Sequence, residues 1–266
     1  MAKLAKMKKL ELLGQGNYGE VFKAEDQDTH EIFAVKIFYM DQDDYAIPRY
    51  VDLLMSRFMN VTEWKNEAIL KYYDYSKNGF DKEHRPALLT EYCVNGSLEN
   101  CIPKMNDTKK IINMYGIANA MHQLHEKGIL HYNLTSKNVL EDENLYPKLK
   151  DFQMSLYLHG LKEMAKLKEI SIYTAPETLI SNDYTKQSEV YAYGIILYEM
   201  IVEEKPFKDM TSYQILEKKI AGYIPPIPDS FSTSLRYLIE SCLDKDPERR
   251  PSFYIIKNFI VSTMNE

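Results

Sequence analysis

The chain has 266 residues, of which 45% are hydrophobic, so it can bury a large core in one domain or two lobes. Its net charge of −6 gives no basis for nucleic-acid binding. Three cysteines at unrelated spacings, Cys93, Cys101 and Cys242, indicate neither a disulfide framework nor a zinc site. The longest apolar run, residues 191–202, is too short to cross a bilayer, and residues 1–9 lack the apolar segment of a secretory signal. We therefore expect an intracellular, cytoplasmic domain without a transmembrane segment.

The first third of the chain has the pattern of a β-rich unit. Residues 10–40 alternate in hydrophobicity and are enriched in β-branched and aromatic residues, which predicts strands. Residues 46–58 switch to helical spacing. Two further short strands are predicted near residues 69–75 and 86–92.

The remainder of the chain has helical periodicity. A long helix is predicted from Thr108 onward, with Asp107 and Thr108 able to cap it. Its predicted apolar stripe consists of Ile111, Ile112, Tyr115, Ala118, Met121 and His125. Further helices are predicted around residues 188–202, 212–220, 233–243 and 251–263. A β-rich first third and a helical remainder, joined at residues 91–97, indicate a two-lobed α+β enzyme.

Residues 13–21 contain a G-x-G-x-x-G motif formed by Gly14, Gly16 and Gly19. This motif alone is weak, because dinucleotide-binding folds share it. In those folds the third glycine opens a helix, whereas here Gly19 leads into the strand pattern that begins at Val21. We therefore predict a hairpin whose backbone N–H groups can lie over phosphates. Lys36 follows on the next strand and can pair with those phosphates.

Other motifs follow in a fixed order, and together they resemble a known family. They are Leu88 to Cys93, His131 to Asn138, Asp151-Phe152-Gln153, Ala175-Pro176-Glu177, Ser188 to Gly194 and Arg249-Arg250-Pro251. From end to end, the chain resembles a eukaryotic protein kinase domain of the tyrosine-kinase-like group, with degraded catalytic motifs.

The resemblance implies a bilobal α+β kinase fold over residues 1–266. The small β-rich N-lobe would span residues 1–91, the hinge 91–97 and the larger helical C-lobe 98–266. It also implies a site for ATP and Mg²⁺. The implied nucleotide-binding residues are Leu13, Gly14, Gly16, Gly19, Val21, Ala34, Lys36, the gatekeeper Thr90, Glu91, Cys93 and Leu140. Asn138 and Asp151 are the implied metal ligands, and an arginine of residues 249–250 is expected to pair with Glu177.

The sequence departs from the family pattern at positions that take part in phosphoryl transfer or its regulation. Asn133 stands where the family has the catalytic aspartate, and a carboxamide cannot take the proton of a substrate hydroxyl. Tyr132 replaces the arginine that reads activation-loop phosphate. Thr135 and Ile170 replace the lysine and threonine that frame the hydroxyl in serine/threonine kinases, and Ser171 would need a register change to serve.

The sequence leaves two questions open, namely the effect of Gln153 on Asp151 and the identity of the acid that pairs with Lys36. Gln153 replaces the glycine after Asp-Phe, which can fix the motif in one conformation or tilt Asp151 away from the metal. The acid that pairs with Lys36 can be Asp52, Glu63 or Glu67.

Three functions are compatible with this sequence. The first is a nucleotide-binding pseudokinase that acts as a scaffold or allosteric regulator of a protein partner in signalling. The second is a weakly active kinase that transfers the ATP γ-phosphate to protein Ser, Thr or Tyr. The third is an interaction module that binds no nucleotide, because fold resemblance alone does not establish activity.

Overall fold

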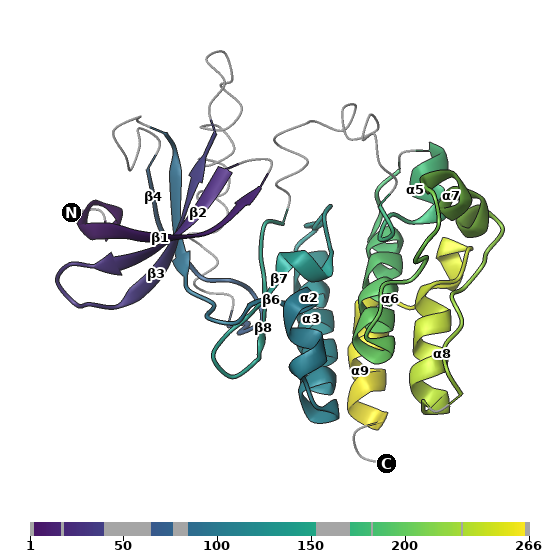
Figure 1. Ribbon diagram of the computed structural model, residues 1–266. Helices are drawn as coiled ribbons and strands as arrows, with labels where there is room; N and C mark the ends of the chain where they lie inside the picture. The colour runs from purple at the N-terminus through teal and green to yellow at the C-terminus, as the bar shows by residue number, and fades with distance from the viewer. Residues whose placement is uncertain are drawn as a thin grey trace. The chain divides into compact units, whose positions relative to one another are not determined.

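The computed structural model describes residues 3–16, 19–39, 65–76, 85–152, 171–181, 183–229 and 231–263. The chain divides into two compact units, Met1–Val94 and Asn95–Glu266. The first unit is built on a β-sheet and the second is largely helical (Figure 1). The predicted α+β class is confirmed, whereas the predicted helix at residues 46–58 lies outside the described residues.

The first unit contains a five-stranded antiparallel sheet in the order β1-β2-β3-β5-β4. Its strands are β1 (Met7–Gly16), β2 (Gly19–Asp26), β3 (Ile32–Phe38), β4 (Tyr72–Ser76) and β5 (Ala87–Glu91), preceded by the 3₁₀ turn η1 (Lys3–Lys6). Val35, Ile37 and Leu89 form the centre of its apolar core. Burial of these β-branched and leucine side chains is what holds the sheet together.

The hairpin predicted at the glycine motif is present. β1 and β2 pair antiparallel, with Gly14 opposite Val21 and Gly16 opposite Gly19. A Cβ atom at Gly19 would lie 2.1 Å from the carbonyl oxygen of Ile37, so a larger residue would force β2 and β3 apart at this point. The glycine therefore sets how closely the start of β2 approaches β3.

The second unit combines a small sheet with a helical bundle. Its three strands are β6 (Gly96–Ser97), β7 (Val139–Glu141) and β8 (Pro147–Leu149). Its α-helices are α2 (Leu98–Cys101), α3 (Asp107–Glu126), α5 (Pro176–Ser181), α6 (Lys186–Val202), α7 (Ser212–Ile220), α8 (Thr233–Cys242) and α9 (Phe253–Thr263). Short 3₁₀ turns lie at η3 (Ile102–Lys104), η4 (Ser136–Asn138) and η5 (Pro247–Arg249).

Helix α6 forms the core of the second unit. Every residue from Ser188 to Ile201 is buried, as expected for a helix that is apolar on all sides. A capping box between Thr185 and Ser188 fixes its first turn. A Cβ atom at Gly194 would lie 2.8 Å from Cys242 Cβ, so this glycine lets α6 pack closely against the end of α8 (Figure 1).

The predicted cap and stripe of α3 need correction. The N-cap is Asn106, whose side chain accepts a hydrogen bond from the Lys109 backbone N–H, and Asp107 is already the first helical residue. Of the predicted stripe, Ala118, Met121 and His125 are buried. Ile111, Ile112 and Tyr115 are only partly buried. The buried face begins instead at Lys110, whose ammonium reaches Glu203 at 2.6 Å, and continues through Asn113 and Met114.

Glu141, at the end of β7, is a fully buried carboxyl group. Neither of its oxygens has a hydrogen-bond partner among the residues described. Burial raises its pKa from 4.5 to about 8, and the negative charge of Asp142 adds to the effect. The folded protein therefore holds a proton that the unfolded chain releases between these two pKa values. The resulting stabilisation is present in full below pH 4.5 and is lost as the pH rises through about 8.

Replacing Glu141 with glutamine should remove this pH dependence, because an amide does not ionise. Between pH 6 and pH 8, the free energy of unfolding of Glu141→Gln is expected to gain about 2 kcal/mol relative to that of the wild type. Urea denaturation at the two pH values measures the gain, and Glu143→Gln, at an exposed neighbouring position, should show none. An equal pH dependence for wild type and Glu141→Gln would contradict the assignment.

Cys93, Cys101 and Cys242 are buried, and none of the three forms a disulfide bond in the described part of the chain. Among the helices described, none has the length and apolarity needed to cross a membrane.

Candidate functional site

The loop from His131 to Asn138 connects α3 to β7 and is anchored by a buried histidine. His131 is fully buried, and burial lowers its pKa to about 4, so its ring is neutral at neutral pH. Its Nδ1 accepts a hydrogen bond of 3.3 Å from the Asn133 backbone N–H, and its ring lies edge-on to Phe152. The imidazole therefore acts as a structural support beneath the loop.

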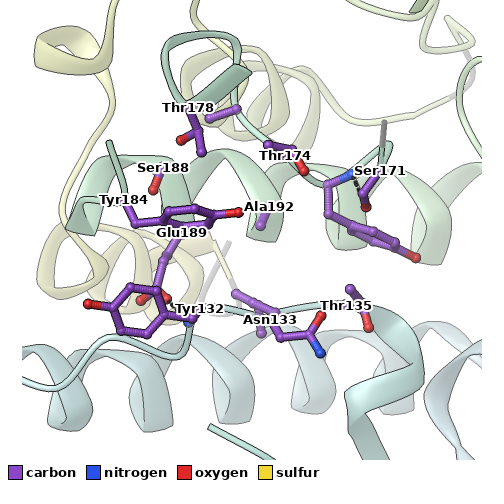
Figure 2. Close-up of a pocket in the computed structure, with 13 residues that line it drawn as sticks. Tyr132, Asn133, Thr135, Ser171, Thr174, Thr178, Tyr184, Ser188, Glu189 and Ala192 are labelled. Carbon is purple, nitrogen blue, oxygen red and sulfur yellow. Dashed lines mark hydrogen bonds between the residues drawn. The ribbon is translucent and has the colours of Figure 1, made fainter. Parts of the chain in front are cut away.

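Asn133 lies on a small pocket of about 100 Å³ (Figure 2). Thr135 and Ser171 line the same pocket, so the structure brings together three of the positions singled out in the sequence. In Figure 2, Asn133 and Thr135 lie along one wall, and Thr178 and Ala192 lie along the other.

Glu189 of α6 holds the loop against the helix. One of its carboxylate oxygens accepts the Tyr132 backbone N–H at 2.6 Å, and the other lies 2.7 Å from His125 Nε2. Tyr132 adopts a left-handed backbone conformation with φ of 65°, which this anchor maintains. The centroids of the Tyr132 and Tyr184 rings lie 5.6 Å apart, so the two aromatic side chains pack together. That Tyr132 stands at the position of the family's arginine stays a prediction.

Asn138 and Asp151 are brought together, and the ammonium group of Lys150 lies between them. Lys150 Nζ donates to Asn138 Oδ1 at 2.9 Å and to Asp151 Oδ2 at 2.7 Å. Asn138 Nδ2 donates to the Asn133 carbonyl at 2.8 Å, which ties this cluster to the loop. Asp151 also adopts a left-handed conformation, with φ of 59°, which aspartate tolerates better than most residues.

The segment from Ser171 to Ala175 is fixed by buried polar groups. Tyr173 Oη lies 2.9 Å from Ser136 Oγ and donates to Glu199 at 2.8 Å. Burial raises the pKa values of both Tyr173 and Glu199. This network ties the segment from Ser171 to Ala175 to the loop from His131 to Asn138 and to α6.

Two basic residues hold this segment and the start of α5 in place. Lys219 of α7 is buried and donates to the carbonyl oxygens of residues 171, 172 and 174. Arg250 forms a two-pronged ion pair with Glu177, at 2.6 and 2.8 Å. The pairing expected between Glu177 and one of residues 249–250 is thereby confirmed, with Arg250 as the partner.

In the first unit, several of the predicted nucleotide-binding residues lie on adjacent strands. Val21 pairs with Gly14 on one side and with Lys36 on the other, and Ala34 pairs with Thr90. Gly14, Val21 and Lys36 thus form one cross-strand row over β1, β2 and β3, and Ala34 and Thr90 form a second row over β3 and β5. Their role in nucleotide binding stays a prediction.

The other predicted nucleotide-binding positions also have defined surroundings. The Thr90 hydroxyl donates to the Glu91 carbonyl oxygen at 3.2 Å, and Cys93 is buried. Leu13 is exposed, and Leu140 lies on β7 of the second unit, where it is half-buried. Their contacts with a nucleotide stay predictions.

Some candidates cannot be located. Asp52, Glu63, Gln153 and Ile170 lie outside the described residues. Glu67 is described and forms an exposed ion pair with Lys71 at 3.2 Å. The acid that pairs with Lys36 therefore stays open.

The structure adds several residues that the sequence analysis did not assign to the site, and Lys150 is the one that contacts the predicted metal ligands. Lys150 directly precedes the predicted metal ligand Asp151 in the sequence, so its positive charge is a signal of competition with a metal ion. Its contact with Asn138 depends on the pairing of β7 with β8, where Val139 lies opposite Leu149. Sequence spacing alone could not reveal it.

Comparison with known proteins gives one family. The model of the protein kinase domain matches residues 7–260. A probable serine/threonine-protein kinase of Dictyostelium discoideum is 36% identical over 181 residues, covering 65% of this chain and 19% of the relative. The dual specificity protein kinase shkC of the same organism is 28% identical over 263 residues, covering 91% of this chain and 48% of the relative.

A receptor from an animal is also similar. Ephrin type-A receptor 5 of Rattus norvegicus is 32% identical over 182 residues, covering 65% of this chain and 18% of the receptor. These matches span at most about half the length of the relatives. Because the family model covers nearly the whole chain, the chain belongs to the protein kinase domain family and has its bilobal α+β fold.

Proposed function

We propose that this domain is a pseudokinase that binds ATP and acts in the cytoplasm as a scaffold or allosteric regulator of a protein partner in signalling. The observation that carries the proposal is that Asn133 lies on the pocket, since the order of the sequence motifs predicts the catalytic aspartate of the family at this position. A carboxamide has no basic site near neutral pH, so it can orient a hydroxyl group but cannot accept its proton. The buried cysteines of the described residues form no disulfide bond, which is consistent with a reducing compartment.

The surroundings of Asn133 support the loss of the base. Among the described residues that line the pocket, Glu189 is the one acid. Both of its oxygens are engaged, by the Tyr132 N–H and by His125. His131 lies beneath the loop with its Nδ1 already accepting the Asn133 N–H. Neither group is placed to take a proton from a substrate.

A weakly active protein kinase is the second candidate, and the clustering of Asn138 with Asp151 favours it. Protein kinases generally use ATP with Mg²⁺, and phosphoryl transfer depends largely on positioning and charge neutralisation. Loss of a general base costs roughly 10²–10⁴ in rate. Slow transfer to protein Ser, Thr or Tyr is therefore compatible with this site.

Nucleotide binding is tested by a thermal-shift titration with ATP, performed both in Mg²⁺ and in EDTA. A ligand that binds only the folded state adds about 2.7 kcal/mol at a concentration of one hundred times its Kd. We expect stabilisation of the wild type and its loss in Lys36→Met, since Lys36 would supply a charge for the phosphates. Lys8→Met, at an exposed position on β1, is the matched control. If millimolar ATP stabilises the wild type in neither condition, the domain is an interaction module without a nucleotide site.

A further inference from the structure

A lysine side chain occupies the centre of the predicted metal site. The Lys150 ammonium group makes hydrogen bonds to Asn138 Oδ1 and Asp151 Oδ2, the two side chains expected to hold Mg²⁺. The lysine side chain is 24% exposed and the aspartate side chain 17%, so the ion pair is largely shielded from solvent. Charge-assisted hydrogen bonds of this kind are the strong ones.

A backbone hydrogen bond to Asn138 fixes the position of Lys150 next to the predicted metal ligands. Its backbone N–H donates to the Asn138 carbonyl at 3.0 Å, beside the paired strands β7 and β8. The Asn138 amide is fixed as well, because its Nδ2 must donate to the Asn133 carbonyl while its Oδ1 accepts from the ammonium. Both polar atoms of the Asn138 side chain therefore have a hydrogen-bond partner of the correct type.

This arrangement does not fit Mg²⁺. The ion requires oxygen ligands at about 2.0–2.1 Å in an octahedral shell. Here the same two oxygens are bound to an ammonium nitrogen at 2.9 and 2.7 Å. A divalent cation at these oxygens would meet a positive charge within a few ångströms, and it would have to displace the lysine.

We propose that Lys150 takes the place of the divalent cation, so that this domain binds ATP independently of Mg²⁺. An ammonium group has three donors, of which Asn138 and Asp151 take two. Within the described ranges of the chain, the third donor has no acceptor, and we assign it to a phosphate oxygen of the nucleotide. This inference rests on the nucleotide binding proposed above, and it makes Lys150 a determinant of which form of ATP is bound.

Titration with ATP in EDTA and in Mg²⁺ tests the inference on the wild type, Lys150→Met and the exposed control Lys208→Met. We expect the wild type and the control to have the same apparent Kd in both conditions. Methionine keeps the apolar stem and removes the charge, so Lys150→Met should bind ATP about tenfold to a hundredfold more weakly in EDTA. Mg²⁺ should restore its affinity. A wild type that needs Mg²⁺, or a Lys150→Met variant that is unaffected in EDTA, would overturn the inference.

A second measurement tests whether Lys150 blocks metal binding, and it does not depend on ATP binding. Free Mn²⁺ is followed by its electron paramagnetic resonance signal in the absence of nucleotide. We expect Lys150→Met to take up Mn²⁺ more tightly than the wild type and Lys208→Met. Equal uptake by all three proteins, or uptake by none, would overturn the inference. A complete absence of ATP binding would instead overturn the proposed function.

Discussion

Asn133→Asp is expected to raise the rate of phosphoryl transfer from ATP by roughly 10²–10⁴, the usual contribution of a general base. This corresponds to about 3–5 kcal/mol of the activation barrier. The two proteins share every other feature of the site, so their ratio isolates the carboxylate. The backbone at this position is already fixed by the Asn133 N–H to His131 and the Asn133 carbonyl to Asn138, and neither bond involves the side chain that changes.

Single-turnover transfer of radiolabelled γ-phosphate, with a generic protein acceptor and excess Mg²⁺, measures the effect. Asn133→Ala is the control, and its rate should stay close to that of the wild type because the carboxamide is not a base. Adding Asp151→Ala to Asn133→Asp identifies any label that comes from a contaminating kinase. A wild type that turns over at about 1–100 s⁻¹, the typical range of kinases, would contradict the account. So would an Asn133→Asp variant no faster than the wild type.

Arg250→Met is expected to lower the free energy of unfolding by about 3–5 kcal/mol, the usual cost of breaking a buried ion pair by removing one partner. The Arg250 side chain is fully buried and the Glu177 side chain is 20% exposed. Besides the two bonds to Glu177, the guanidinium donates to the carbonyl oxygens of Asp244, Gln187 and Lys245. The substitution therefore leaves a largely buried carboxylate and three backbone acceptors without this donor.

Urea denaturation measures this loss, and the adjacent arginine supplies a matched control. Arg249 is 74% exposed and pairs with Asp246 at 3.6 Å, so Arg249→Met should cost less than about 1 kcal/mol. Adding Glu177→Gln to Arg250→Met should recover part of the stability, because it removes the uncompensated charge. If Arg249→Met and Arg250→Met were equally stable, the ion pair could not be what holds the 171–177 segment to the helical core.

Much of the fold could be predicted from the sequence because the local patterns agree with the tertiary structure. The alternating residues that became β2 and β3, and the helical periods of α6 to α9, carry their own signal. The start of α3 was displaced by one residue because Asn106 and Asp107 are both good caps, and only the bond to Lys109 distinguishes them. The burial of Asn113 depends on its bonds to the Lys109 and Leu145 carbonyls, one of which is distant in sequence.

The candidate site could be predicted only in part. Ordered motifs identified Asn133, Asn138 and Asp151. They also anticipated that Glu177 pairs with one of the arginines at 249–250, and the structure shows the partner to be Arg250, 73 residues away. The role of Lys150 was not predictable from spacing, because its ammonium group reaches Asn138 only through the fold. Lys219 was missed for the same reason, since its three carbonyl acceptors lie 45 to 48 residues away in the chain.

The most direct test of the central claim is the fate of ATP labelled on the γ-phosphate after prolonged incubation with stoichiometric protein. The nucleotide retained by the protein is recovered and separated by chromatography. The account predicts that the label is bound and is recovered as intact ATP. Label found on the protein, or released as phosphate in amounts comparable to the protein, would show that the domain retains phosphoryl transfer and would contradict the account.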